Sequence, residues 1–199
     1  MNECSKRKHF QNNIAVVIPS YKVREHVLEV IAGIGPEVTR IIVVDDCCPE
    51  SSGEYVKKNC QDSRVIVIKN KKNLGVGGAV VAGYKKSLEF DVDVVVKLDG
   101  DGQMDPRFIS TLVRPLLEGE ADYAKGNRFF EPDHLVAMPK LRLLGNACLS
   151  FMTKLSSGYW NIFDPTNGYT AIHSKVIKVL SLDKLDNRFF FESDILFRL

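Results

Sequence analysis

Two aspartates separated by a single glycine are the feature of this sequence with the clearest chemical meaning. Asp99, Gly100 and Asp101 follow a valine-rich segment, and the glycine permits a turn that lets both carboxylates reach one hard cation. Mg²⁺ or Mn²⁺ held in this way completes its shell with substrate phosphates and water. Asp and Gly are also common in ordinary turns, so the weight of this motif comes from its place at the end of a buried strand.

The segments around this motif alternate between apolar runs and helical spacing. Strands are expected at residues 14–18, 41–44, 65–68, 92–98, 121–126 and 168–172. Helices are expected at residues 22–33, 54–59, 75–88, 106–117, 138–156, 175–180 and from 191 onward. This alternation predicts an α/β fold, Rossmann-like, with a mostly parallel sheet flanked by helices and a smaller, mixed second half from about residue 121.

Three of the expected strands end in residues that suit a polar ligand. Pro19 and Tyr21 follow the first strand, Asp45 and Asp46 follow the second, and residues 99–103 follow the fourth. Ligands of open α/β sheets bind beyond the carboxyl ends of the strands, so these groups are expected to converge on one edge. Buried acids are costly when unpaired, and their repetition at this edge favours a cation or a polar ligand.

A glycine-rich segment, residues 75–78, opens one of the expected helices. It can bring a helix N-terminus close to an anionic ligand, or it can serve tight packing of the helix on the sheet. The dinucleotide fingerprint G-x-G-x-x-G does not follow the first strand, and no Lys-Ser/Thr follows the glycines as a Walker A loop requires. The sequence therefore excludes both of those nucleotide sites.

The composition is that of an ordinary globular protein. The chain has 199 residues, 45% hydrophobic and 26% charged, with a net charge of +2, which gives no global field to attract nucleic acid. Five cysteines without a CxxC pattern favour reduced thiols in a reducing compartment. Residues 1–13 are expected to be a polar tail, without the apolar core of a signal peptide, and residues 14–199 one domain.

The segment from residue 191 to Leu199 predicts a helix that begins and then stops without a cap. The chain is therefore expected to be a truncated piece of a longer protein. No stretch has the roughly 18 apolar residues of a transmembrane helix, although a longer parent could carry such segments. The helix at residues 138–156 has two interpretations, core packing or an interfacial helix on an anionic membrane.

Several ordered segments together carry a family resemblance. They are Val17–Tyr21, Ile42–Asp46, Asn73–Ala79, Leu98–Pro106, Lys125–Arg128 and Asp164–Tyr169. In this order and spacing the chain resembles the inverting family-2 glycosyltransferases with the GT-A fold. It is most similar to the polyprenyl-phosphate sugar transferase branch typified by dolichol-phosphate mannose synthase. The resemblance covers nearly the whole chain, from about residue 14 to residue 199.

This resemblance implies an enzyme that uses a nucleotide-diphospho-sugar donor. Matched by position, the residues implied to bind substrate are Pro19, Tyr21, Asp45, Asp46, Gly75, Gly78, Asp99, Gln103, Lys125 and Asp164. Pro19 and Tyr21 would line the nucleoside pocket, and Asp45 rather than Asp46 would contact the base or ribose. Asp99 and Asp101 would hold Mg²⁺ or Mn²⁺, which neutralises the departing diphosphate. The chain departs from the family pattern at residues 47–49, where Cys-Cys-Pro replaces a Gly-Ser segment.

The acceptor decides whether a catalytic base is required. A saccharide hydroxyl needs a carboxylate to take its proton, and Glu192 and Asp194 are the candidates, whereas an anionic lipid phosphate needs none. Both acids can also be explained as charges at a helix N-terminus. Arg128 and Lys125 would add positive charge toward a phosphate, or lie on the surface as solvated cations, and Asp164 would shape the acceptor side.

Three functions remain open at this stage. The first is metal-dependent transfer to a polyprenyl phosphate, the second is the same donor chemistry with a saccharide hydroxyl, and the third is a non-catalytic nucleotide-sugar-binding module. The first implies a cytoplasmic enzyme at the inner face of the membrane in the full-length protein, and none implies nucleic acid.

Overall fold

The computed structural model describes residues 12–127, 140–160, 162, 164 and 166–199. Within them, six strands form one sheet in the order β3 (Val65–Lys69), β2 (Val38–Asp45), β1 (Ile14–Ser20), β4 (Val94–Lys97), β6 (Thr170–His173) and β5 (Tyr123–Lys125). The first four of these are parallel, and β6 runs antiparallel to both of its neighbours. The predicted α/β fold with a mostly parallel sheet and a mixed second half is confirmed.

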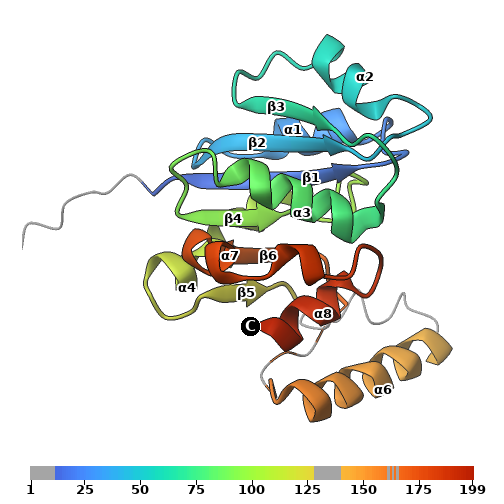
Figure 1. Cartoon of the computed structure of the whole chain (residues 1–199), viewed down its shortest axis with the longest axis vertical. Helices are drawn as coiled ribbons and strands as arrows, with labels where there is room; N and C mark the ends of the chain where they lie inside the picture. The colour runs from blue at the N-terminus through green and yellow to red at the C-terminus, as the bar shows by residue number, and fades with distance from the viewer. Residues whose placement is uncertain (1–11, 128–139, 161, 163, 165) are drawn as a thin grey trace, which may run out of the picture.

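Helices cover both faces of this sheet (Figure 1). One face carries α3 (Gly75–Ser87), α7 (Ser174–Val179) and α8 (Phe191–Arg198). The other carries α1 (Val27–Gly33), α2 (Ser52–Asn59) and α4 (Ile109–Leu117), the last preceded by the short 3-10 turn η1 (Pro106–Phe108). A second 3-10 turn, η3 (Leu182–Lys184), precedes α8, and α6 (Lys140–Ser157) lies beyond the β5 edge next to α8.

The buried strands are continuous apolar runs because both of their faces are covered. In β1, Val16 and Ile18 pack into the core under α1 and α4, whereas Ala15 and Val17 pack under α3. Gly83 allows α3 to approach this closely, since a Cβ there would overlap the side chain of Val17. This packing fixes the carboxyl ends of the central strands side by side at one edge of the sheet.

Several boundaries differ from the sequence prediction; β1, for example, extends to Ser20, and β2 begins at Val38. The first helix begins at Val27 rather than Lys22, because the chain first turns away from β1. Lys22 adopts a left-handed φ of 58°, and the Val23 carbonyl then accepts hydrogen bonds from the amides of His26 and Val27. The fourth strand is limited to Val94–Lys97, four residues rather than seven.

The expected tail, residues 1–13, lies almost wholly outside the described residues, and the division of the chain near residue 121 stays a prediction. Strand β6 of the second half pairs with β4 of the first, so both halves share the sheet. No helix in the described part of the chain is long and apolar enough to cross a membrane.

Candidate active site

Asp45 ends β2 and is buried beside Ser20, its neighbour at the end of β1. Its carboxylate accepts hydrogen bonds from the backbone amides of Cys48 (2.8 Å) and Gly53 (2.9 Å). These amides belong to the turn into α2 and to the first turn of that helix, which leaves free N–H groups there. Asp45 therefore fixes the start of α2 against the sheet, and a role in contacting the nucleoside stays a prediction.

Asp46 is also buried and organises the start of α3. It accepts hydrogen bonds from the Asn70 side chain (2.7 Å) and from the amides of Leu74 (2.9 Å) and Gly75 (2.8 Å). Gly75 has a φ of +84°, a conformation that suits glycine. The two adjacent acids thus hold the first turns of two different helices, α2 and α3.

The glycine-rich start of α3 packs tightly against residues 186–188, which precede α8. The Gly78 amide donates a hydrogen bond to the Asn187 carbonyl (3.0 Å), and a Cβ at Gly77 would overlap the Asp186 carbonyl oxygen. These contacts support the interpretation that the glycines serve close packing of the helix. Substrate binding by Gly75 and Gly78 stays a prediction.

Pro19 lies within β1, where it pairs with Val44, rather than after the strand as predicted, and Tyr21 lies in the turn that follows. Pro19 is half-buried and Tyr21 is exposed, as residues that contact a ligand at a surface cleft would be. The Lys22 amide donates a hydrogen bond to the Cys48 sulfur (3.1 Å), which joins this turn to the β2–α2 turn. Burial raises the pKa of the Cys48 thiol, but hydrogen bonds from Ser52 and from backbone amides outweigh it and leave the pKa below its usual value.

Asp99 and Asp101 lie on the turn that follows β4, as the sequence predicts. Gly102 turns the backbone with a φ of +79°, and the Gln103 amide donates a hydrogen bond to Asp101 Oδ1 (3.0 Å). The side chain of Gln103 is exposed. Among the described residues, no group of three or more His, Cys, Asp or Glu side chains could hold a metal ion. Two carboxylates still suit Mg²⁺ or Mn²⁺ when substrate phosphates supply further ligands.

A buried lysine lies directly beneath the metal motif, and the sequence prediction missed it. Lys97 is 1% exposed, and its Nζ lies 3.0 Å from Asp99 Oδ1 and 2.8 Å from Glu192 Oε1. Burial lowers the pKa of Lys97, but the two carboxylates outweigh this and raise it above its usual value, so the ammonium stays protonated. The available signal was a lone basic residue inside the valine run that leads into Asp99.

The two candidate bases occupy different environments. Glu192 points into the sheet and pairs with Lys97. Asp194 accepts a hydrogen bond from the Asp186 amide (2.8 Å) and one from Arg198 Nε (3.0 Å), so it ties α8 to the segment before it. Glu192 therefore shares the Lys97 ammonium with Asp99, whereas Asp194 does not contact this ammonium.

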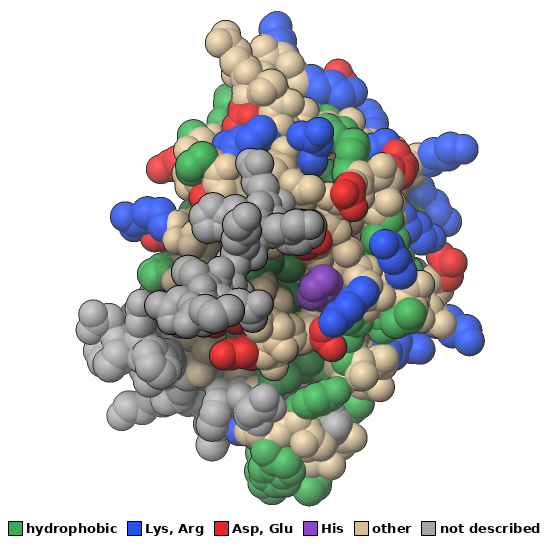
Figure 2. Space-filling model, turned by 90° about the vertical axis from the view of Figure 1, so that its left-hand side faces the viewer, with side chains coloured by type: hydrophobic (Ala, Val, Ile, Leu, Met, Phe, Trp, Pro, Cys, Tyr) green, Lys and Arg blue, Asp and Glu red, His purple; other side chains and the backbone are tan. Residues whose placement is uncertain are grey.

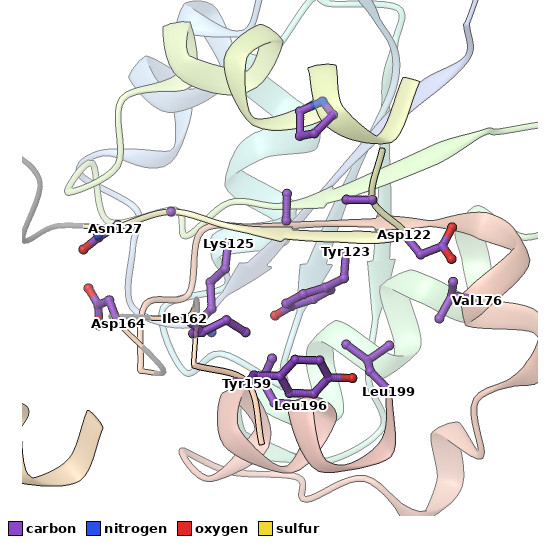
Figure 3. Close-up of a pocket in the computed structure, with 14 residues that line it drawn as sticks. Asp122, Tyr123, Lys125, Asn127, Tyr159, Ile162, Asp164, Val176, Leu196 and Leu199 are labelled. Atoms are coloured by element: carbon purple, nitrogen blue, oxygen red, sulfur yellow. The ribbon is translucent and has the colours of Figure 1, made fainter. Parts of the chain in front are cut away.

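A cavity of about 490 Å³ lies between β5, α8 and the side chains of Tyr159, Ile162 and Asp164 (Figure 3). Lys125, Asn127 and Asp164 line it toward one end, and Leu196 of α8 and the following Leu199 line another side. Lys125 and Lys97 both pair with the same residue of β6, so the cavity begins one strand away from the ion cluster. Two residues predicted to bind substrate, Lys125 and Asp164, thus share one cavity, whereas Arg128 lies outside the described residues.

Comparison with known proteins identifies what this arrangement resembles. A family model described as "Glycosyl transferase family 2" matches residues 15–180. The UDP-N-acetylglucosamine–dolichyl-phosphate N-acetylglucosaminyltransferase of Methanococcus voltae is 31% identical over 182 residues, covering 84% of this chain and 72% of its own. The undecaprenyl-phosphate mannosyltransferase of Micrococcus luteus is 27% identical over 189 residues, covering 93% of this chain and 76% of its own.

The same fold occurs in a solved structure, the glucosyl-3-phosphoglycerate synthase of Mycobacterium tuberculosis in complex with Mn²⁺, UDP and glucosyl-3-phosphoglycerate. The two superpose with a TM-score of 0.68 at 20% sequence identity. The match covers 92% of this chain and 63% of the synthase, so this chain spans less than two thirds of that protein.

Proposed function

The chain belongs to glycosyltransferase family 2, and from that premise we propose that it transfers a sugar from a nucleotide-diphospho-sugar to a polyprenyl phosphate. The prediction of a family-2 glycosyltransferase with the GT-A fold is confirmed by the family match and by the shared fold. Relatives that carry sugars to dolichyl and undecaprenyl phosphates support the predicted branch.

The observation that carries the choice of acceptor is the state of the two candidate bases. Glu192 is 8% exposed and its carboxylate is held by the buried ammonium of Lys97. Asp194 is held by the Asp186 amide and by Arg198. Both carboxylates are thus engaged by donors of the protein itself, which argues against either one serving as a base. An acceptor that is already anionic removes the need for a base, and a lipid phosphate meets that condition.

The transfer then needs no proton step. An oxygen of the acceptor phosphate forms a new bond to the anomeric carbon, the bond from that carbon to the donor diphosphate breaks, and the nucleoside diphosphate leaves with the electron pair. Asp99 and Asp101 are proposed to face the place where the leaving diphosphate gathers charge. When bound there, a divalent ion supplies charge neutralisation and a template for the phosphates.

The residues present fit such an ion. Both carboxylates lie on one turn, and the Asp99 side chain is 28% exposed, so it is open on one side. Mn²⁺ is present in the solved structure that shares this fold, which supports a divalent cofactor here, either Mg²⁺ or Mn²⁺. We assign the metal to Asp99 and Asp101 and the adjacent polar contact with the donor to Gln103.

The remaining assignments follow the geometry of the edge. Tyr21 and Pro19 are proposed to line the nucleoside pocket, with Asp45 at its base. Lys125 and Asp164, which share the cavity beside the ion cluster, are proposed to act on the acceptor side. Arg128, which follows β5 in the sequence and lies outside the described residues, is proposed as a phosphate contact.

A lipid-linked acceptor requires contact with a membrane, and exposed apolar side chains support it. Phe151, Met152 and Leu155 lie on α6, Trp160 follows α6, and Phe189 and Phe190 precede α8. We call these six side chains the apolar rim. Figure 2 shows hydrophobic side chains at the lower end of the molecule, where Figure 1 places α6. We propose that this apolar rim meets the inner, cytoplasmic face of the membrane in the full-length protein.

The direct test is product analysis. The protein is incubated with radiolabelled UDP- and GDP-sugars, Mn²⁺, and either undecaprenyl phosphate or free oligosaccharides. Organic-phase label that depends on undecaprenyl phosphate is expected, and Asp101→Asn should abolish it. Asp183→Asn is the matched control, because Asp183 is an exposed acid that pairs with Lys85 away from this edge. Label on the saccharide and none on the lipid would overturn the proposal in favour of a hydroxyl acceptor.

A further inference from the structure

The ion cluster beneath the metal motif contains one ammonium and two carboxylates. Lys97 extends from β4 and contacts Asp99 of the following turn and Glu192 of α8, which is 95 residues further along the chain. A buried charge needs a partner, but one carboxylate would be enough to balance one ammonium. The cluster therefore keeps a surplus negative charge, and Asp101 on the same turn adds to it.

Gly168, just before β6, covers one side of the cluster. Gly168 lies against it so closely that a Cβ would overlap Lys97 Nζ and would lie 2.8 Å from Asp99 Oδ2. The Asn167 side chain accepts a hydrogen bond from the Tyr169 amide (2.9 Å), which holds the backbone around Gly168 in this shape. The position of the Asp99 carboxylate is thus set on one side by the ammonium and on another by the backbone of Gly168.

We propose that Lys97 is a positioning residue, whose ammonium holds the Asp99 carboxylate in the orientation in which Asp99 and Asp101 bind a divalent ion together, with Glu192 anchoring the ammonium. This inference rests on the proposed function. It assigns Lys97 no contact with substrate. It also gives Glu192 a role that differs from a catalytic base, because its carboxylate acts on the ammonium rather than on the acceptor.

The competing explanation is a purely structural ion pair that joins β4 to α8. The two explanations separate in a charge-matched double variant, Lys97→Met with Glu192→Leu. It removes one positive and one negative charge, so the net charge near Asp99 is unchanged, and it replaces the pair with apolar groups, which often preserves stability. Because the lost ammonium is the charge nearer to Asp99, the potential there becomes more negative and by itself favours a cation, so a loss of metal affinity reports the orientation of Asp99.

The experiment measures Mn²⁺ binding by electron paramagnetic resonance, with and without UDP, and the melting temperature of the same samples. We expect the double variant to melt within a few degrees of the unmodified protein and to bind Mn²⁺ at least tenfold more weakly. Binding within threefold at a preserved melting temperature would overturn the proposal. The single variant Lys97→Arg should bind Mn²⁺ more tightly than the double variant, because its guanidinium restores a donor to Asp99. Equal Mn²⁺ affinity in these two variants would count against positioning.

A second variant covers the case in which the double variant does not fold. Gly168→Ala removes no charge but pushes a methyl group onto Lys97 Nζ and Asp99 Oδ2, so it should also weaken Mn²⁺ binding at least tenfold. Unchanged Mn²⁺ affinity in Gly168→Ala would overturn the proposal independently. Failure of the proposed function is distinguishable from failure of this inference. If the unmodified protein binds Mn²⁺ and UDP but transfers nothing to undecaprenyl phosphate, the proposed function fails, and the comparison of Mn²⁺ affinities between variants can still be made.

Discussion

Glu192→Gln is the substitution that best separates a counter-ion from a catalytic base. Glutamine has the same shape and can still accept a hydrogen bond from Lys97 Nζ, so the packing of α8 is retained. What is lost is a negative charge 2.8 Å from a buried ammonium. Two unit charges about 4 Å apart interact by about 4 kcal/mol at the effective dielectric constant of a protein.

The net cost is smaller than this Coulomb energy. Burying the glutamate itself is unfavourable, and Asp99 remains 3.0 Å from Lys97 to offset part of its charge. We expect a loss of about 2 kcal/mol in the free energy of unfolding, or a fall in Tm of about 4–8 °C for a chain of this length. The rate of sugar transfer should fall less than tenfold, because no proton transfer depends on Glu192.

Differential scanning calorimetry and single-turnover transfer to undecaprenyl phosphate measure the two quantities on the same preparation. Glu89→Gln is the matched control, because Glu89 is an exposed acid paired with Lys86 on the surface. Such pairs contribute well under 1 kcal/mol, so its Tm should hardly change. An unchanged Tm for Glu192→Gln together with a hundredfold or greater loss of rate would refute the reasoning, since that is the signature of a general base.

Three further predictions follow from contacts in the structure. Asp46→Ala removes the acceptor of three hydrogen bonds at the start of α3 and should cost about 3–5 kcal/mol in urea unfolding; a cost below 1 kcal/mol would contradict this role. The side chain of Arg64 holds the pKa of Asp62 below its usual value, so the stability contributed by Asp62 is complete above about pH 4 and disappears as the pH falls through the lowered pKa. Asp62→Asn should therefore lower Tm at pH 7, and this deficit should shrink as the pH falls below about 4; a deficit that does not change with pH would argue against the ion pair. Phe189→Ser should weaken sedimentation with anionic vesicles about tenfold, because Phe189 is 91% exposed on the apolar rim, whereas Val179→Ser, at a position 82% exposed on α7, should not; equal effects would exclude a specific membrane face.

The fold was predictable because its signals are local. Apolar runs such as Ile41–Val44 identify buried parallel strands wherever they occur, and the helices between them follow from spacing and length. The convergence of Asp45 and Asp99 at one edge then follows from the topology of a parallel sheet. Boundaries were less predictable, since the left-handed Lys22 delays α1 through a tertiary contact with Cys48.

The partners of the site residues were not predictable, because they come from distant parts of the chain. No spacing rule connects Lys97 to Glu192, and a lysine within a strand does not reveal on its own that it is buried. The same holds for Asp46, whose acceptor sites are filled by amides at the start of α3. Sequence patterns identified the acidic residues, but only the packing of the helices defines what each carboxylate holds.

The separation of Lys97 from its partner also constrains the order in which the protein can fold. At a synthesis rate of about 5–20 residues per second, roughly 5–20 s pass between the appearance of residue 97 and that of residue 192. Until β6 is made, β4 has an open side in the nascent sheet, and until residue 192 is made the Lys97 ammonium lacks its second carboxylate. The carboxyl end of the sheet, where donor binding is proposed, therefore matures last, when α8 docks, although most of its residues are made first.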